Sequence, residues 1–264
     1  MSYWNAFAAK YPSRPFLRLD GGSIFNPGTA ESEVVDRWML EGTARSGLDA
    51  LNLSASDLPV WQELGDLRVA GYLPKNLLEI PLVTGNVVPK VPNFPAVSRY
   101  LIKEYTLAGN PGKPFRVGIT GLLSDPEERI PRSDFEIRNP EAAAREVIGE
   151  LRDKTDLRII LTDMKVGAAI SLAATVPEIH LILVSHDYEA VAEPQVIGKT
   201  LVLLSVKEGR ALTEIRVMVD PVTFAKKFQA RFVALDGTVP DDPAMGQLQR
   251  DARAAIDALK QPKS

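Results

Sequence analysis

The sequence has 264 residues, 45% of them hydrophobic and none of them cysteine, and its 31 basic and 34 acidic residues leave a formal net charge of -3. This length and apolar content are enough for a sizeable core, and the lack of cysteine excludes disulfides, thiolate metal sites and a cysteine nucleophile. The nearly balanced charge argues against nucleic acid as a partner, and the lack of an apolar run of about 18 residues argues against membrane insertion.

In the first half of the sequence, short apolar runs alternate with helical patterns, which is typical of an α/β domain. The segment after Gly28 places Val34, Val35, Trp38 and Met39 on one helical face, and Gly47 suits its C-cap. The other predicted helices are 2–12 and 57–65, and the predicted strands are 15–20, 48–54, 80–87, 98–107 and 115–123.

The second half predicts a strand-helix-strand unit with parallel strands, at 157–163, 167–175 and 179–185. A helix that begins at Asn139 and Pro140 precedes it, with an inward stripe of Ala143, Ala144, Val147, Ile148 and Leu151. Residues 198–205 and 211–220 are predicted to form a hairpin, and residues 241–260 a closing amphipathic helix.

Four short polar loops follow predicted strands, and the carboxyl ends of parallel strands are where α/β proteins gather ligands. These loops carry residues 20–23, 54–57, 162–164 and 185–188. The sequence therefore predicts one shared site at this edge of the sheet.

The order and spacing of these loops resemble the metallophosphoesterase domain of the 5'-nucleotidase (calcineurin-like phosphoesterase) superfamily. The similar stretches are PFLRLDGGSIF, GLDALNLSASDLP, FRVGITGLLSDP, FEIRNPEAAAREVIGELRDKTDLRIILTDM and IHLILVSHDY, within about residues 15–220. The resemblance implies a metallophosphoesterase-like four-layer α/β/β/α sandwich with mixed sheets over residues 1–235. It implies that residues 236–264 form a connector helix to a second, nucleotide-binding domain that the sequence does not contain.

The metal-binding motifs of that family are degenerate in this sequence. The first motif, D-x-H on a strand, has no counterpart, because helix 2–12 stands in its place. Ser23 occupies the position of the bridging aspartate, Ser54 to Asp57 replace the G-N-H-E ligands, and Asp163 replaces a histidine. Two dications about 3.5–4 Å apart repel strongly without a bridging carboxylate. We therefore expect neither a dinuclear centre nor a cofactor.

Of the last family motif, only His186 remains, and Tyr188 stands at its second ligand position. One interpretation is a single Mn²⁺ or Zn²⁺ bound by His186 and Asp163, with Asp187 or Asp20 as a third ligand. The other, which we favour, is a half-buried histidine that hydrogen-bonds to a neighbouring loop. The second histidine, His180, begins its strand and is predicted to be structural or exposed.

The remaining polar residues of the cleft have ordinary structural interpretations. Asp20 suits a cap of the turn through Gly21 and Gly22, and Asp57 suits an N-cap for the helix after it. Ser23 and Ser56 are predicted to be turn hydroxyls, because no histidine base has a place beside either. Asn86 matches a turn of the family whose role is architectural.

These patterns predict a catalytically inactive domain that serves as a binding or scaffolding module for a protein partner or a missing fused domain. The alternative is a metal-dependent phosphoester or nucleotide hydrolase with a single-metal site at His186 and Asp163. A third hypothesis has a partner supply the missing strand to a sheet edge. The resemblance implies an extracytoplasmic, periplasmic location, although the first residues contain no signal peptide pattern.

Overall fold

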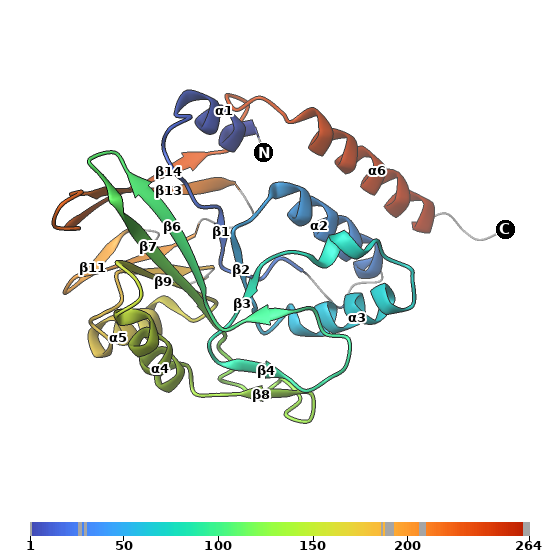
Figure 1. The fold of residues 1–264 in the computed structure, drawn as a ribbon. Coiled ribbons are helices and arrows are strands. Elements are labelled where there is room, and N and C mark those ends of the chain that lie inside the picture. Colours follow the sequence, from blue (N-terminus) through green and yellow to red (C-terminus); the bar gives the residue numbers. More distant parts are fainter. Residues whose placement is uncertain are drawn as a thin grey trace.

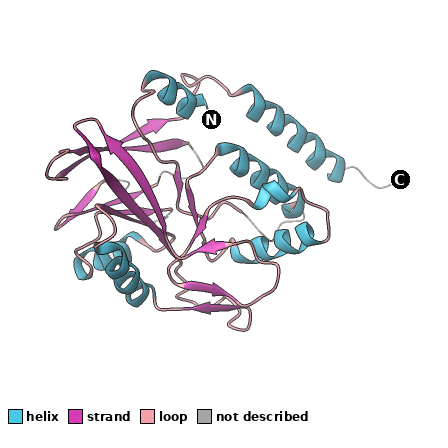
Figure 2. Cartoon of the chain, viewed as in Figure 1, coloured by secondary structure: helices cyan, strands magenta, loops and turns pink. Residues whose placement is uncertain are grey.

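Two β-sheets lie face to face between two sets of helices in the computed structural model (Figure 1). The structure describes residues 2–25, 28, 31–185, 187, 193–205 and 210–260. Figure 2 shows helices on either side of the central strands.

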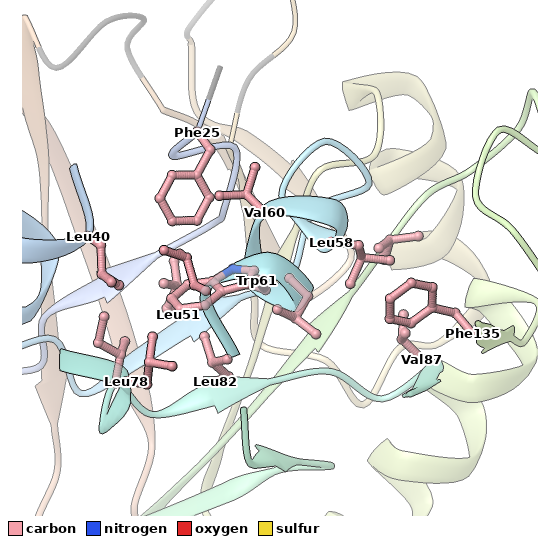
Figure 3. Packing of buried hydrophobic residues seen from close by; sticks show 14 of the residues in the cluster. Phe25, Leu40, Leu51, Leu58, Val60, Trp61, Leu78, Leu82, Val87 and Phe135 are labelled. Carbon is pink, nitrogen blue, oxygen red and sulfur yellow. The ribbon is translucent and has the colours of Figure 1, made fainter. Parts of the chain in front are cut away.

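The four-stranded sheet is entirely parallel and is covered by α2 (Ser32–Ser46), α3 (Leu58–Val69) and the short helix η1 (Lys75–Leu78). Leu51 of the sheet, Leu40 of α2 and Trp61 of α3 are fully buried in this layer (Figure 3). The order of its strands is β1 (Leu19–Asp20), β2 (Ala50–Asn52), β3 (Leu82–Val83) and β5 (Val97–Ser98).

The six-stranded sheet is parallel in its centre and antiparallel at both edges. Helices α4 (Pro140–Arg152) and α5 (Val166–Thr175) pack on its outer face. The order of its strands is β11 (Gln195–Ile197), β12 (Thr200–Leu204), β10 (Leu181–Val184), β9 (Leu157–Thr162), β7 (Asn110–Leu122) and β6 (Leu101–Leu107).

A third apolar cluster fills the space between the two sheets. It joins Ala50 and Val83 of the four-stranded sheet to Ile119, Ile159 and Leu161 of the six-stranded sheet. The layers are thus helix, sheet, sheet, helix, which confirms the predicted four-layer sandwich. One detail differs, because only the six-stranded sheet is mixed.

Several local predictions are confirmed. The side chain of Asn139 accepts a hydrogen bond from the backbone of Ala142 at the start of α4, and all five residues of the predicted stripe are buried. Strands β9 and β10 are parallel. Gly47 ends α2 with a φ of 63°, a left-handed conformation in which glycine has no steric penalty.

The predicted hairpin between residues 198–205 and 211–220 is wrong. Strand β12 is buried along its whole length and therefore lies in the interior of the six-stranded sheet, parallel to β10. Strand β13 (Ala211–Val219) pairs instead with β14 (Lys226–Ala234), a strand that we did not predict. Residues 206–209, which would form most of the predicted turn, lie outside the described residues.

Two other predictions need correction. The predicted strand 80–87 divides into β3 and β4 (Val87–Pro89), and β4 pairs with β8 (Phe135–Ile137) in a separate small sheet. Met39 is 43% exposed, whereas Leu40 beside it is buried, so the inward face of α2 is rotated from the predicted one.

Both terminal helices form as predicted. Helix α1 (Ser2–Lys10) opens the chain, and α6 (Pro243–Lys260) runs along α2, where Leu248 packs near Gly42 (Figure 1). The division at residue 235 and the connector role of α6 remain predictions. None of the helices in the described ranges is both long and apolar enough to cross a membrane.

Candidate functional site at the carboxyl ends of the strands

The four predicted loops do meet at one edge of the two sheets. The backbone N–H of Ser23 donates to Oγ of Ser54 at 3.0 Å, which joins the loops after β1 and β2. The N–H of Ala55 donates to Asp163 after β9 at 2.9 Å. A methyl group added at Gly21 would stand 2.7 Å from Cβ of Ser185, so the loop after β10 lies against the loop after β1.

Asp57 is fully buried at the centre of this edge. Its carboxylate accepts backbone N–H groups from Ser23 at 2.7 Å, Ile24 at 3.3 Å and Phe25 at 3.0 Å. Burial raises the pKa of Asp57, while the hydrogen bonds that it accepts oppose this shift. The prediction that its side chain caps α3 is wrong. Asp57 stands at the N-cap position, but its carboxylate is directed at the loop after β1, whose N–H groups need acceptors.

Asp163 joins the two sheets. One carboxylate oxygen accepts the N–H of Ala55, and the other accepts the N–H of Ser124, just after β7, at 2.6 Å. Burial raises the pKa of Asp163 to about 7, and the negative charge of Asp57 adds to the rise. The two backbone donors act in the opposite direction but do not offset it.

Asp20 caps its turn, as predicted. Its carboxylate accepts the N–H of Gly22 at 3.0 Å, and burial, with the charge of Asp57, raises its pKa to about 6. Ser56 lies 3.1 Å from Ser54, oxygen to oxygen, which fits a turn hydroxyl. Ser23 has a left-handed backbone, with a φ of 65°.

Only one of the two histidines, His180, lies within the described residues. His186, and Tyr188 beyond it, fall outside the described residues, so both interpretations of His186 and the position of Tyr188 remain predictions. Asp187 accepts the N–H of Val166 at 2.9 Å at the start of α5. His180 accepts the N–H of Arg158 at Nδ1, at 3.1 Å, and burial lowers its pKa to about 3. Of the two predicted alternatives for His180, structural or exposed, the structure supports the first.

Sequence reasoning missed the part played by Asn52. It is fully buried at the end of β2, and its Nδ2 donates to the carbonyl groups of Gly21 at 3.0 Å and Leu122 at 3.3 Å. A polar residue within the otherwise apolar run ALNL, residues 50–53, was the available signal. Buried side-chain amides are nearly always hydrogen-bonded.

Asn86 connects strand ends in the same way. Its Nδ2 donates to the carbonyl groups of Leu123 at 2.8 Å and Arg138 at 3.1 Å, and its Oδ1 accepts the N–H of Leu123 at 2.8 Å. The predicted architectural role of this residue is confirmed.

The described residues do not fit a two-metal centre. Within them, no group of three or more histidine, aspartate or glutamate side chains is arranged to hold a metal ion. Asp20, Asp57 and Asp163 lie close enough for the charge of Asp57 to raise the pKa of the other two. Each of these carboxylates, however, accepts backbone N–H groups, whose positive ends oppose the approach of a cation.

Neither protein-family models nor curated protein sequences match this chain. Solved structures do. The sulfate thiohydrolase SoxB from Thermus thermophilus aligns with a TM-score of 0.75 and 18% identity over 96% of this chain and 46% of its own. The calcineurin-like phosphoesterase YfkN from Bacillus subtilis aligns with a TM-score of 0.69 and 16% identity over 97% of this chain and 89% of its own.

The precursor of a 5'-nucleotidase, also from Thermus thermophilus, aligns with a TM-score of 0.70 and 20% identity, over 97% of this chain and 53% of its own. The chain thus spans about half the length of SoxB and of this nucleotidase. Identities this low establish a common architecture and leave the chemistry open. The chain has the fold of the metallophosphoesterase domain found in calcineurin-like phosphoesterases and 5'-nucleotidases.

Proposed function

We propose that this chain is a catalytically inactive domain of the metallophosphoesterase fold that serves as a binding or scaffolding module. One observation carries the proposal. Asp163, which replaces a metal-binding histidine in the sequence resemblance, accepts backbone N–H groups at both of its carboxylate oxygens. The residue is part of the internal hydrogen bonding of the fold.

Hydrolysis by two metals needs several oxygen and nitrogen ligands that converge on the ions, and one carboxylate between the ions. In the sequence resemblance the position of that carboxylate is held by Ser23, whose neutral hydroxyl supplies no charge to offset two dications. Asp57, the most buried carboxylate of the site, accepts three backbone N–H groups. The site is therefore acidic, and its buried carboxylates accept backbone N–H groups.

The proposed partner is a protein or a fused domain outside the cytoplasm. Strand β1 supports a protein partner, because it is the end strand of the four-stranded sheet and a sheet edge can pair with a further strand. Leu259, near the end of α6, is 53% exposed and lies on the apolar side of that helix. Fractionation of cells that express the tagged full-length protein would test the location, and recovery in the cytoplasm alone would contradict it.

The activity is tested by metal analysis and hydrolysis assays on the purified chain. We expect less than one equivalent of manganese or zinc after incubation with either metal and dialysis, and no turnover of phosphomonoesters or nucleotides above buffer. The Bacillus subtilis phosphoesterase, assayed in parallel, is the positive control. Stoichiometric metal together with turnover would refute the proposal.

A second candidate is a hydrolase with a single metal at His186 and Asp163. The observation that favours it is the gathering of Asp20, Asp57 and Asp163, because a cation would relieve the repulsion that the charge of Asp57 exerts on the other two carboxylates. This hypothesis predicts that His186→Ala abolishes metal uptake. The same metal content in this variant and in the wild type would count against it.

A further inference from the structure

The loops at the carboxyl edge satisfy several backbone N–H groups with carboxylates rather than with other backbone groups. These donors are Ser23, Ile24 and Phe25 after β1, Ala55 after β2 and Ser124 after β7. We infer that Asp57 and Asp163 hold these loops together by hydrogen bonds and so keep the shape of the edge without a bound metal ion. The inference deepens the proposed function, but its test is separate.

The contacts of Asp57 fix the loop after β1 along three consecutive residues. Oδ2 accepts the N–H groups of Ser23 and Ile24, and Oδ1 accepts that of Phe25. The side chain of Phe25 then packs edge to face on Trp61 of α3, with ring centroids 5.3 Å apart (Figure 3). Asp57 and Trp61 thus fix the backbone and the side chain of the same short segment.

The contacts of Asp163 join segments that are remote in the sequence. Ala55 is 108 positions away and follows a strand of the four-stranded sheet, whereas Ser124 is 39 positions away and follows β7 of the six-stranded sheet. One carboxylate therefore connects both sheets at their carboxyl edge. In metal-dependent proteins a bound ion commonly makes such connections, and metal binding then contributes to folding.

An asparagine in place of either aspartate keeps the size of the side chain but only one acceptor oxygen. Its NH₂ group then faces a backbone N–H donor, so at least one buried donor loses its partner. The two aspartates engage different donors, so each variant serves as the control for the other.

Amide hydrogen exchange, resolved by NMR, tests the inference on the full chain in the presence of EDTA. In the wild type we expect the N–H groups of Ser23, Phe25, Ala55 and Ser124 to exchange at least about tenfold more slowly than those of exposed loop residues such as Gly237. We expect Asp163→Asn to accelerate exchange about tenfold at Ala55, Ser124 or both, without a change at Ser23 and Phe25. Asp57→Asn should give the reverse pattern.

Unprotected donors in the wild type would overturn the inference, and this result does not depend on whether the variants fold. Protection that appears only after manganese or zinc is added would also overturn it, because a metal would then hold the loops. Failure to find a partner, or turnover of phosphoesters, would count against the proposed function only. The exchange rates would still decide whether Asp57 and Asp163 hold the loops together.

Discussion

The Oδ1 atom of Asn52 lies against the α-carbon of Gly121, where the ends of β2 and β7 meet. A methyl group added at Gly121 would stand 2.1 Å from this oxygen and 2.4 Å from the carbonyl oxygen of Val83. The buried Oδ1 atom has no N–H or O–H donor among the described residues, and a weak Cα–H···O contact suits the space that remains. The two sheets can approach this closely because residue 121 has no side chain.

Gly121→Ala should therefore destabilise the fold severely. Both obstructing atoms belong to well-fixed groups, so the strands would have to separate, at a cost of at least about 3 kcal/mol in the free energy of unfolding. Chemical denaturation would measure this cost. Gly149→Ala in α4 is the matched control, because nothing lies within 4 Å of the added methyl group. It should stabilise the protein by about 0.5–1 kcal/mol, as for glycine in other helix interiors.

Asn86→Ala should also lower the free energy of unfolding, by roughly 2–4 kcal/mol. It leaves the buried N–H and C=O groups of Leu123 and the part-buried C=O group of Arg138 without their partner. Urea denaturation of the variant and the wild type checks the difference. Asn5→Ala in α1 is the control, because Asn5 is exposed. It should change the free energy of unfolding by less than about 0.5 kcal/mol. Equal effects of the two substitutions would contradict the architectural role of Asn86.

The sequence predicted local structure well and distant pairing poorly. The stripe of α4, the cap at Asn139 and the parallel strands around α5 follow from periodicity and connection rules, which act over a few residues. The pattern of residues 211–220 predicted a strand but could not identify its partner. The pairing depended on β12, because its apolar residues are buried more fully beside β10 in the interior of the sheet than they would be in a hairpin.

The same limit applies to the candidate site. The rule for strand ends predicted which loops meet, and a short acidic residue beside glycines predicted the turn at Asp20. The acceptor roles of Asp57 and Asp163 depend on N–H groups from other loops, whose positions are set only when the sheets pack. Local propensity favoured a helix cap at Asp57. In the structure its carboxylate instead accepts the N–H groups of the loop after β1.

Asp163 should make the stability of the wild type fall as the pH rises. Its pKa is about 7 in the folded chain and 3.8 in its unperturbed form, so between these values the folded state holds a proton that the unfolded state has released. That stabilisation is complete below about pH 4 and is lost as the pH approaches 7. Asp163→Asn lacks this proton, so its deficit relative to the wild type should shrink by roughly 1 kcal/mol for each pH unit between 5 and 7. Urea denaturation at these pH values would show it, and a constant deficit would contradict the raised pKa.

His180 should give a pH dependence of the opposite sign. Burial lowers its pKa from 6.5 to about 3, and the nearby charge of Arg158 acts in the same direction. Between these values the unfolded state binds a proton that the folded state does not, so stability is lost as the pH falls below 6.5. His180→Asn keeps an acceptor for the N–H of Arg158 and removes the titration. The melting temperature of the wild type should therefore fall by a few degrees relative to this variant between pH 7 and pH 5. If the melting temperatures of the two proteins changed with pH by the same amount, His180 would titrate in the folded state as it does in the unfolded chain. That result would remove the basis for its structural role.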